Sequence, residues 1–326
     1  MSAARIGITM GDPSGIGPEL IVGVLADVDA ALRARTTVYG DPALFARIGL
    51  AADVRVVATS ALAEADAAPG APSPAGGVAQ LAALERAITD ARAGVLEAIV
   101  TAPISKRQVK AAGLAFPGHT ELFADRFAAP RHAMMFAGPR MNVVLATIHC
   151  ALGDVPRRLT AEGIADAAFL GAETLARRLG VERPRVGVLG LNPHAGEGGL
   201  FGDEEARIVA PGIARARAEL AAAGIEATVD GPLVPDGCVR DAVAAGPGAR
   251  PARWDLLVAL YHDQGLIPVK LIDFEDAVNV TLGLPIVRTS PDHGVAYDLA
   301  GTGPGGPKPR RTSFAAALRL ADRLAR

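Results

Sequence analysis

The stretch that most constrains this chain is an apolar run at residues 256–260 that stops abruptly at Tyr-His-Asp-Gln-Gly, residues 261–265. An unbroken apolar run of this length indicates a buried strand. Polar side chains placed where such a strand ends are typical of the ligand-binding edge of an open α/β sheet. A surface loop with a solvated histidine is the alternative interpretation.

The same pattern recurs along the chain, where short apolar runs alternate with helical segments. Strands are predicted at residues 6–10, 37–40, 54–57, 98–100, 142–148, 186–190, 229–236, 256–260, 277–281 and 285–289. Helices are predicted at 80–93 and 160–179, up to Leu220, and from residue 312, with a surface loop at 65–77. This alternation indicates an α/β fold.

Size and composition exclude several classes of function. The 326 residues, half of them hydrophobic, are enough for one large or two ordinary domains. A net charge of −2 gives no global basic field for nucleic acid or a membrane surface, so an anionic substrate must be held by local cations. The sequence has no membrane-length apolar run and no signal peptide, and Cys150 and Cys238 form no disulfide framework. We expect a soluble cytoplasmic protein.

A glycine-rich turn follows the first predicted strand. Residues 11–20 are Gly-Asp-Pro-Ser-Gly-Ile-Gly-Pro-Glu-Leu, with Pro18 suited to the first turn of a helix. The spacing matches neither the dinucleotide fingerprint nor the P-loop, so it predicts no nucleotide site. Two interpretations stay open: a simple strand-to-helix turn, or a wall of an active-site cleft.

Three histidines, His149, His194 and His262, each stand directly beyond an apolar, strand-like run. At the carboxyl ends of strands in one sheet they would converge, and three imidazoles with open positions suit Zn²⁺ or Co²⁺ acting as a Lewis acid. Their spacing forms no local metal motif, so a metal site and three structural histidines are both open interpretations. Asp263 is either an orienting acceptor for a ligand or a ligand itself. A surface position is predicted for His132.

Candidate anion-binding groups lie in other segments. Lys270 and Arg288 are the side chains best suited to hold a phosphate or carboxylate, and Asn279 lies midway between them in the sequence. His119 and Thr120 are suited to hydrogen-bond an oxyanion or a hydroxyl. The alternatives are two surface cations and a helix start with Thr120 as its cap.

Five blocks of sequence resemble the 4-hydroxythreonine-4-phosphate dehydrogenase (PdxA) family. They are Ile-Thr-Met-Gly-Asp-Pro-Ser-Gly-Ile-Gly-Pro-Glu (8–19), Pro-Gly-His-Thr-Glu (117–121), Asn-Pro-His-Ala-Gly-Glu (192–197), Tyr-His-Asp-Gln-Gly (261–265) and Val-Asn-Val-Thr-Leu-Gly-Leu-Pro (278–285). The resemblance implies two α/β/α domains similar to isocitrate and isopropylmalate dehydrogenases, with the active site in the interdomain cleft. It places residues 1–135 and 285–326 in the first domain, and 136–284, with the metal histidines, in the second. It also implies a homodimer whose metal is shared between subunits.

Carried onto this sequence, the resemblance implies roles for individual residues. The metal ligands are His149, His194 and His262; the substrate contacts are His119, Thr120, Lys270, Asn279 and Arg288; the catalytic candidates are Lys270 and Asp263; and the cofactor is expected near Asp292, His293 and Gly294 and the turn at 301–303. The implied reaction is oxidation of 4-phosphooxy-L-threonine by NAD or NADP, with a Zn²⁺, Co²⁺ or Mg²⁺ ion on the reacting hydroxyl. The β-keto acid then loses CO₂ to give 3-amino-2-oxopropyl phosphate in pyridoxal 5′-phosphate biosynthesis.

One position departs from the family pattern. Residues 149–152 are His-Cys-Ala-Leu, where the pyridoxine-pathway enzymes usually have His-x-Pro-Leu. Because proline fixes its own φ and restricts the residue before it, Ala151 is expected to free the backbone near His149. An alanine here is similar to the branch that oxidises D-threonate or D-erythronate 4-phosphate, which stays open as the alternative substrate. A binding protein that keeps the fold without catalysis is the alternative of another class.

Overall fold

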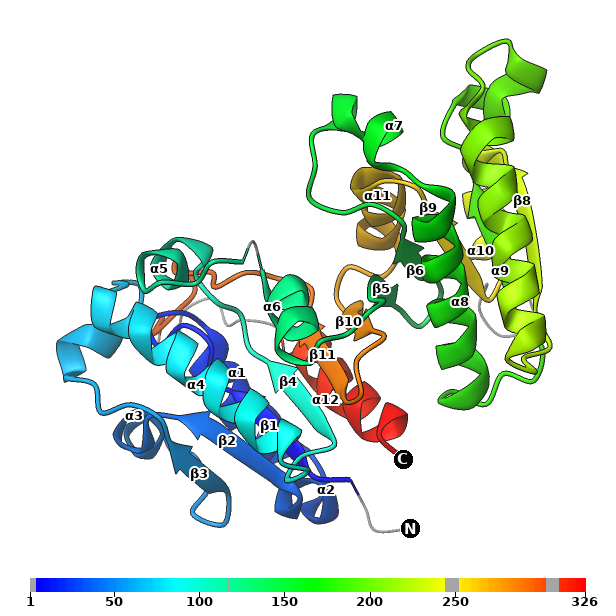
Figure 1. Ribbon diagram of the computed structural model, residues 1–326. Helices are drawn as coiled ribbons and strands as arrows, with labels where there is room; N and C mark the ends of the chain where they lie inside the picture. The colour runs from blue at the N-terminus through cyan, green and yellow to red at the C-terminus, as the bar shows by residue number, and fades with distance from the viewer. Residues whose placement is uncertain (1–3, 117, 244–251, 303–310) are drawn as a thin grey trace. The chain divides into compact units, whose positions relative to one another are not determined.

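The computed structural model describes residues 4–116, 118–243, 252–302 and 311–326, and the chain forms two compact units (Figure 1). The first unit combines Met1–Ala129 with Leu284–Arg326, and the second is Pro130–Gly283. The sequence-based expectation puts the boundaries after residues 135 and 284. Each unit has its own sheet strands, helices and buried core.

The first unit is built on five parallel strands. In sheet order they are β3 (Arg55–Ala58), β2 (Thr36–Gly40), β1 (Ile6–Thr9), β4 (Ala98–Thr101) and β11 (Val287–Pro291). The helices are α1 (Gly17–Asp27), α2 (Ala30–Ala34), α3 (Pro42–Arg47), α4 (Pro74–Arg92), α5 (Lys106–Ala111), α6 (His119–Arg126) and α12 (Thr312–Leu324), with a 3₁₀ turn at Glu64–Ala67. Every residue of β1 and β4 is buried, as expected of parallel strands covered on both faces.

Helix α4 illustrates how the sequence builds this unit. The Ser73 side chain accepts a hydrogen bond from Gly76 N at 3.0 Å, which caps the first turn. Leu84 and Ile88, four residues apart, lie on the buried face of the helix and share a core cluster with Ile99 of β4. Truncating Leu84 to alanine would cost about 2–5 kcal/mol, because the cavity left behind collapses only partly.

The second unit is built on six strands. Their order is β10 (Val278–Leu282), β5 (Ala133–Ala137), β6 (Asn142–Leu145), β9 (Leu256–Ala259), β7 (Arg185–Leu189) and β8 (Thr228–Leu233). Strand β5 runs antiparallel to both neighbours, and the pairs from β6 to β8 are parallel. The helices are α7 (Val155–Arg158), α8 (Ala161–Arg177), α9 (Ala210–Ala222), α10 (Pro235–Ala242) and α11 (His262–Ile272), with a 3₁₀ turn at Leu152–Asp154 and a π-helical turn at Glu205–Val209.

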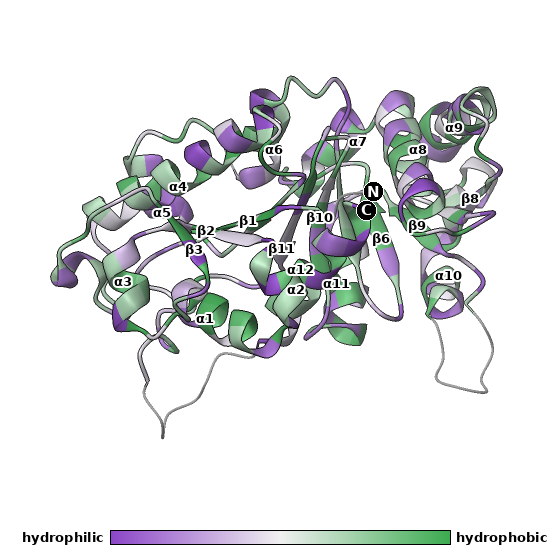
Figure 2. Cartoon of the chain, turned by 90° about the horizontal axis from the view of Figure 1, so that it is seen from below, coloured by the Kyte–Doolittle hydropathy of each residue, from purple (hydrophilic) through white to green (hydrophobic). Residues whose placement is uncertain are grey.

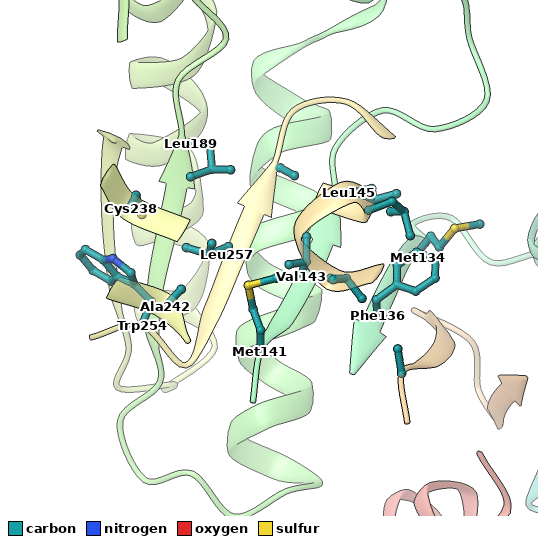
Figure 3. Close-up of a cluster of buried hydrophobic side chains, with 14 residues drawn as sticks. Met134, Phe136, Met141, Val143, Leu145, Leu189, Cys238, Ala242, Trp254 and Leu257 are labelled. Atoms are coloured by element: carbon teal, nitrogen blue, oxygen red, sulfur yellow. The ribbon is translucent and has the colours of Figure 1, made fainter. Parts of the chain in front are cut away.

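Helices cover both faces of this second sheet. On one face, Phe136 of β5, Val143 of β6 and Leu257 of β9 form a buried cluster with side chains of α10 and α11 (Figure 3). On the other face, Gly171 of α8 approaches Leu256 so closely that an added Cβ would lie 2.3 Å from its side chain. Helix α8 packs beside α9, and Figure 2 shows hydrophilic and hydrophobic residues interspersed along it.

The order of the strands groups the segments that carry candidate site residues. Strands β6, β9 and β7 are parallel neighbours, so the carboxyl ends that precede His149, His262 and His194 lie at one edge of the second unit's sheet. In the first unit, β1, β4 and β11 are also parallel neighbours. Their carboxyl ends lead into the glycine-rich turn at 11–20, the segment before α5 and the segment 292–294.

Several expectations about local structure are wrong. Strand β5 matches no predicted strand, and residues 262–272 form helix α11 in place of the loop considered as an alternative. The strand predicted at 142–148 ends at Leu145, and the loop predicted at 65–77 includes a 3₁₀ turn and the start of α4. Within the four described ranges, none of the helices is long and apolar enough to span a membrane.

Candidate active site

Two of the three predicted metal ligands, His149 and His262, lie together in the second unit. Their ring centroids are 5.8 Å apart. The Thr147 hydroxyl donates to the Leu260 carbonyl at 2.6 Å, which ties the segment after β6 to the segment after β9. Thr147 and Leu260 each lie two residues before a histidine. This hydrogen bond therefore links the segments that carry His149 and His262.

A neighbouring carboxylate orients His262. Its Nδ1 atom lies 2.7 Å from Asp263 Oδ1, and this contact leaves Nε2 for a ligand. His149, His262 and Asp263 line a pocket of about 490 Å³, whose other lining residues are Ile148, Cys150, Ala151, Leu152, Val155 and Tyr261. The structure thus favours the orienting role for Asp263.

His194 occupies a backbone conformation that side chains rarely adopt. In the segment Pro193–Gly199, five consecutive residues from His194 have φ between 45° and 79°, so the chain makes a left-handed turn. Three of them, His194, Ala195 and Glu197, are not glycine, and each costs roughly 1–2 kcal/mol in this region because Cβ approaches the following carbonyl. Such a turn persists only when surrounding contacts hold it.

Gln264 connects the backbones that lead to His262 and His194. Its Oε1 accepts a hydrogen bond from Leu260 N at 2.7 Å, and its Nε2 donates to Gly190 O at 2.7 Å. Leu260 follows β9 and Gly190 follows β7. One amide side chain therefore fixes the ends of two neighbouring strands relative to each other.

The three histidines do not form one cluster within a single chain. Among the residues that the structure describes, no group of three or more His, Cys, Asp or Glu side chains could hold a metal ion. Two imidazoles that ligate one metal at about 2.1 Å have centroids roughly 5–6 Å apart. The 5.8 Å separation of His149 and His262, with Asp263 on Nδ1, fits this requirement. The three-histidine site stays a prediction.

In the first unit, Arg288 is a buried cation on β11. Its side chain is 2% exposed, donates to Thr101 Oγ1 at 2.6 Å, and lies over the Phe123 ring at 5.7 Å. Burial lowers the pKa of Arg288 to about 9, while the charge of Glu121 opposes the shift. The guanidinium is therefore still protonated at neutral pH, in a setting that favours an added anion.

His119 begins helix α6 close to this cation. Its Nε2 atom is buried and has no hydrogen-bond partner in the described part of the chain. Burial, together with the charges of Arg288 and Lys106, holds the pKa of His119 well below its ordinary value, so the imidazole is neutral. The residue before the helix is Gly118, so Thr120 is a buried residue of the first turn and not the helix cap considered for it.

Lys270 and Asn279, predicted to contact the substrate, lie in the second unit. Lys270 is on α11, seven residues after Asp263, and therefore on the same face of the helix two turns later. Its Nζ atom lies 5.8 Å from the Phe274 ring. Asn279 is on β10, with Oδ1 buried and without a hydrogen-bond partner in the described ranges.

The glycine-rich turn of the first unit holds the segment that follows the predicted cofactor residues Asp292, His293 and Gly294. Asp12 accepts a hydrogen bond from the Tyr297 hydroxyl at 2.7 Å, and Glu19 accepts one from Gly301 N at 2.7 Å. The turn connects β1 to α1 and, through these two hydrogen bonds, also holds the segment from Tyr297 to Gly301. Gly303, part of the predicted cofactor turn, lies outside the described residues.

Comparison with known proteins decides the family. The model of the family described as pyridoxal phosphate biosynthetic protein PdxA matches residues 24–321. The chain belongs to the PdxA family. Among its relatives, a 4-hydroxythreonine-4-phosphate dehydrogenase of Desulfosudis oleivorans is 48% identical over 317 residues, covering 91% of this chain and 90% of that protein. A protein of the same name from Geobacter metallireducens is 46% identical and covers 99% of this chain and 96% of that protein.

A solved structure agrees with the PdxA assignment. The crystal structure of 4-hydroxythreonine-4-phosphate dehydrogenase from Klebsiella pneumoniae matches with a TM-score of 0.80 and 36% identity, covering 99% of this chain and 100% of that one. This confirms the predicted α/β fold. The relatives are dehydrogenases, so this PdxA-family chain is an enzyme, a dehydrogenase that acts on a CH–OH group.

Some residues that position the predicted ligands of this PdxA-family site were not identified from the sequence. Gln264 lies inside a quoted motif, but its bridging role depends on Gly190, which is far away in sequence. Asn192 and Glu205 hold the segment that leads to His194. A sequence gives no signal that a particular glutamate among many is buried.

Proposed function

We propose that this enzyme oxidises 4-phosphooxy-L-threonine with NAD or NADP, in pyridoxal 5′-phosphate biosynthesis. The carbon that bears the secondary hydroxyl loses hydride to the nicotinamide and the hydroxyl oxygen loses a proton to the protein, giving a β-keto acid. Loss of CO₂ and uptake of a proton then give 3-amino-2-oxopropyl phosphate. The observation that carries the proposal is the His149–His262 pair oriented by Asp263, in a chain 48% identical to an enzyme of that name.

The proposed metal site uses His149, His262 and His194. A bound Zn²⁺, Co²⁺ or Mg²⁺ ion would act as a Lewis acid on the substrate oxygen. Asp263 fixes the His262 ring through Nδ1 and so keeps Nε2 available. Lys270 Nζ, on the same helix face as Asp263, moves the proton of the reacting hydroxyl.

The proposed phosphate contacts are Arg288, His119 and Thr120, with Lys270 and Asn279 as further substrate contacts. Arg288 supplies a buried charge and a planar set of donors, and the first turn of α6 adds the positive end of a helix dipole. A neutral His119 can donate one hydrogen bond without adding charge. Binding energy from a phosphate remote from the reacting carbon can hold that carbon in position for hydride transfer. We place Asp292, His293 and Gly294 beside the dinucleotide.

We also propose a homodimer whose metal is shared between subunits. Helix α11 exposes Ile267 and Leu271, and Phe274 follows just after its end; these side chains are 65%, 84% and 66% exposed. This apolar stripe runs beside Lys270. Leu200 and Phe201, close to His194, are also large and exposed. Exposed apolar side chains gathered near site residues favour an interface, and a second copy that covers them could supply its His194 to the His149–His262 pair.

The free cysteines favour a cytoplasmic location. Cys150 and Cys238 are both free thiols, which is the state that a reducing compartment maintains. Burial raises the pKa of the Cys238 thiol to about 11, so it is inert at neutral pH.

The function is tested by NAD and NADP reduction with 4-phosphooxy-L-threonine and each divalent metal in turn. We expect activity that requires metal and is lost in His262→Ala. Arg288→Lys keeps the charge but loses the planar fork, so its preference for the phosphorylated over the dephosphorylated substrate should fall at least about tenfold. Arg319→Lys, an exposed position on α12, is the matched control. No reduction with any metal would contradict the proposal.

The sugar-acid branch remains the second candidate substrate class because of Ala151. The structure gives Ala151 a φ of −62° and a ψ of 142°, which is the conformation that proline imposes. Ala151 therefore has the backbone conformation that a proline at this position would have. This favours 4-phosphooxy-L-threonine, and a kcat/KM at least tenfold higher for D-threonate or D-erythronate 4-phosphate would reverse the choice.

A further inference from the structure

A buried carboxylate lies beneath the loop that carries His194. Glu205 starts the π-helical turn Glu205–Val209 and is 6% exposed. Its Oε1 atom accepts hydrogen bonds from the backbone N–H groups of Leu191 and Asn192, both at 2.8 Å. Its Oε2 atom accepts a third from Asn192 Nδ2 at 2.9 Å. Burial alone would raise the pKa of Glu205, but the hydrogen bonds from Asn192 and Leu191 outweigh it and hold the pKa below its ordinary value.

The same carboxylate also contacts the middle of the left-handed turn. At Gly196, which has a φ of 79°, an added Cβ would lie 2.7 Å from Glu205 Oε2. Glu205 therefore bonds residues 191 and 192 before His194 and lies close to residue 196 after it. Glu204 adds a second acceptor for Asn192 Nδ2, at 2.8 Å.

These hydrogen bonds can explain why the turn keeps a backbone conformation that its own residues do not favour. His194 and Ala195 have φ values of 54° and 53°, which an isolated chain rarely adopts. The local sequence does not favour the conformation, so contacts from elsewhere must select it. Three charge-assisted hydrogen bonds donated to one carboxylate are strong enough and directional enough to do so.

We propose that Glu205 is a positioning residue for His194. Its carboxylate fixes the backbone from Leu191 to Gly196, and so presents the His194 imidazole in one orientation toward the metal. Glu205 does not touch the substrate or the metal. The inference rests on the proposed role of His194 as a metal donor.

The test compares Glu205→Gln with Asp203→Asn in the full-length protein. Both changes replace a carboxylate by an amide on the same segment, but Asp203 is exposed and bonds only Arg207 among the contacts described. In Glu205→Gln, the new NH₂ group faces Asn192 Nδ2, donor against donor. We expect Co²⁺ to bind about 10–100-fold more weakly, with an altered visible spectrum of bound Co²⁺, while Asp203→Asn matches the unaltered protein in both.

Two further variants separate this inference from the function on which it rests. If His194→Ala leaves Co²⁺ affinity unchanged, the metal role of His194 is wrong. If His194→Ala weakens Co²⁺ binding but folded Glu205→Gln, judged by its Tm, keeps both the affinity and the spectrum, the positioning role is wrong. Glu205→Asp retains the charge but retracts it by one methylene. Glu205→Asp replaces Glu205→Gln as the test if the latter does not fold. Unaltered Co²⁺ affinity and spectrum in Glu205→Asp would equally overturn the proposal.

Discussion

A neutral histidine beside a buried arginine contributes to the acid sensitivity of the first unit. The pKa of His119 is held well below its ordinary value by burial and by the charges of Arg288 and Lys106. In the unfolded chain its pKa returns to about 6.5. Below that pH the unfolded state binds more protons than the folded state, so stability falls as pH falls; above it, the contribution is fully present.

His119→Gln is therefore expected to lessen the loss of stability in acid. Between pH 7.5 and 5.5 the free energy of unfolding should fall less steeply in the variant, by up to about 1.4 kcal/mol for each pH unit below 6.5. Urea unfolding at the two pH values measures this. His132→Gln, which changes an exposed histidine, is the control. Equal pH dependence in the variant and the unaltered protein would mean that His119 takes up its proton normally in the folded state.

Ala151 lies two residues after the predicted metal ligand His149. The residue already has the φ that proline would impose, so Ala151→Pro should fit without strain at that residue. We expect the free energy of unfolding to be unchanged or higher by up to about 1 kcal/mol, because proline restricts the unfolded chain. Substrate preference should stay the same. A variant that folds normally but changes its preferred substrate would show that this side chain, and not its backbone, selects the substrate.

At the scale of elements, local patterns identify buried strands better than they identify helix α11. The sequence indicates β1, β4, β7 and β9 because each is a short apolar run. Helix α11 is hidden because Gly265 and Pro268 both suggest a break. In the structure Gly265 lies inside the helix and allows it to pack close to β6, because an added Cβ would lie 2.7 Å from Val143.

The exposed stripe on α11 gives a prediction about assembly. Leu271→Asp places a charge on a side chain that is 84% exposed in the single chain, so the fold should survive while a dimer that buries this stripe dissociates. Light scattering should find a monomer with an unchanged circular dichroism spectrum. Val78→Asp, on an exposed apolar residue of α4, should leave the mass unchanged. A Leu271→Asp protein with the mass of the unaltered protein would remove α11 from the interface.

At the scale of the whole molecule, the sequence shows that three histidines follow strands but not that those strands are neighbours. The order β6-β9-β7 departs from the order along the chain, and β8 pairs beyond β7. Which strand lies beside which depends on how helices such as α8 and α11 pack on the two faces. That packing joins residues distant in sequence, as Gln264 joins Leu260 to Gly190, so periodicity alone could not supply it.

The proposed sharing of a metal site between subunits leads to a prediction that depends on the assembly of two complete chains. If His149 and His262 of one copy receive His194 from the other, then His262→Ala and His194→Ala proteins are each inactive alone. In a mixed dimer with one variant chain of each kind, one metal site contains both substitutions and the other site keeps all three histidines. Unfolding the two together and refolding them at random should therefore restore about a quarter of the normal activity and of the tightly bound metal. Each variant refolded alone is the control. A mixture as inactive as its components would place all three donors in one chain and contradict the shared site.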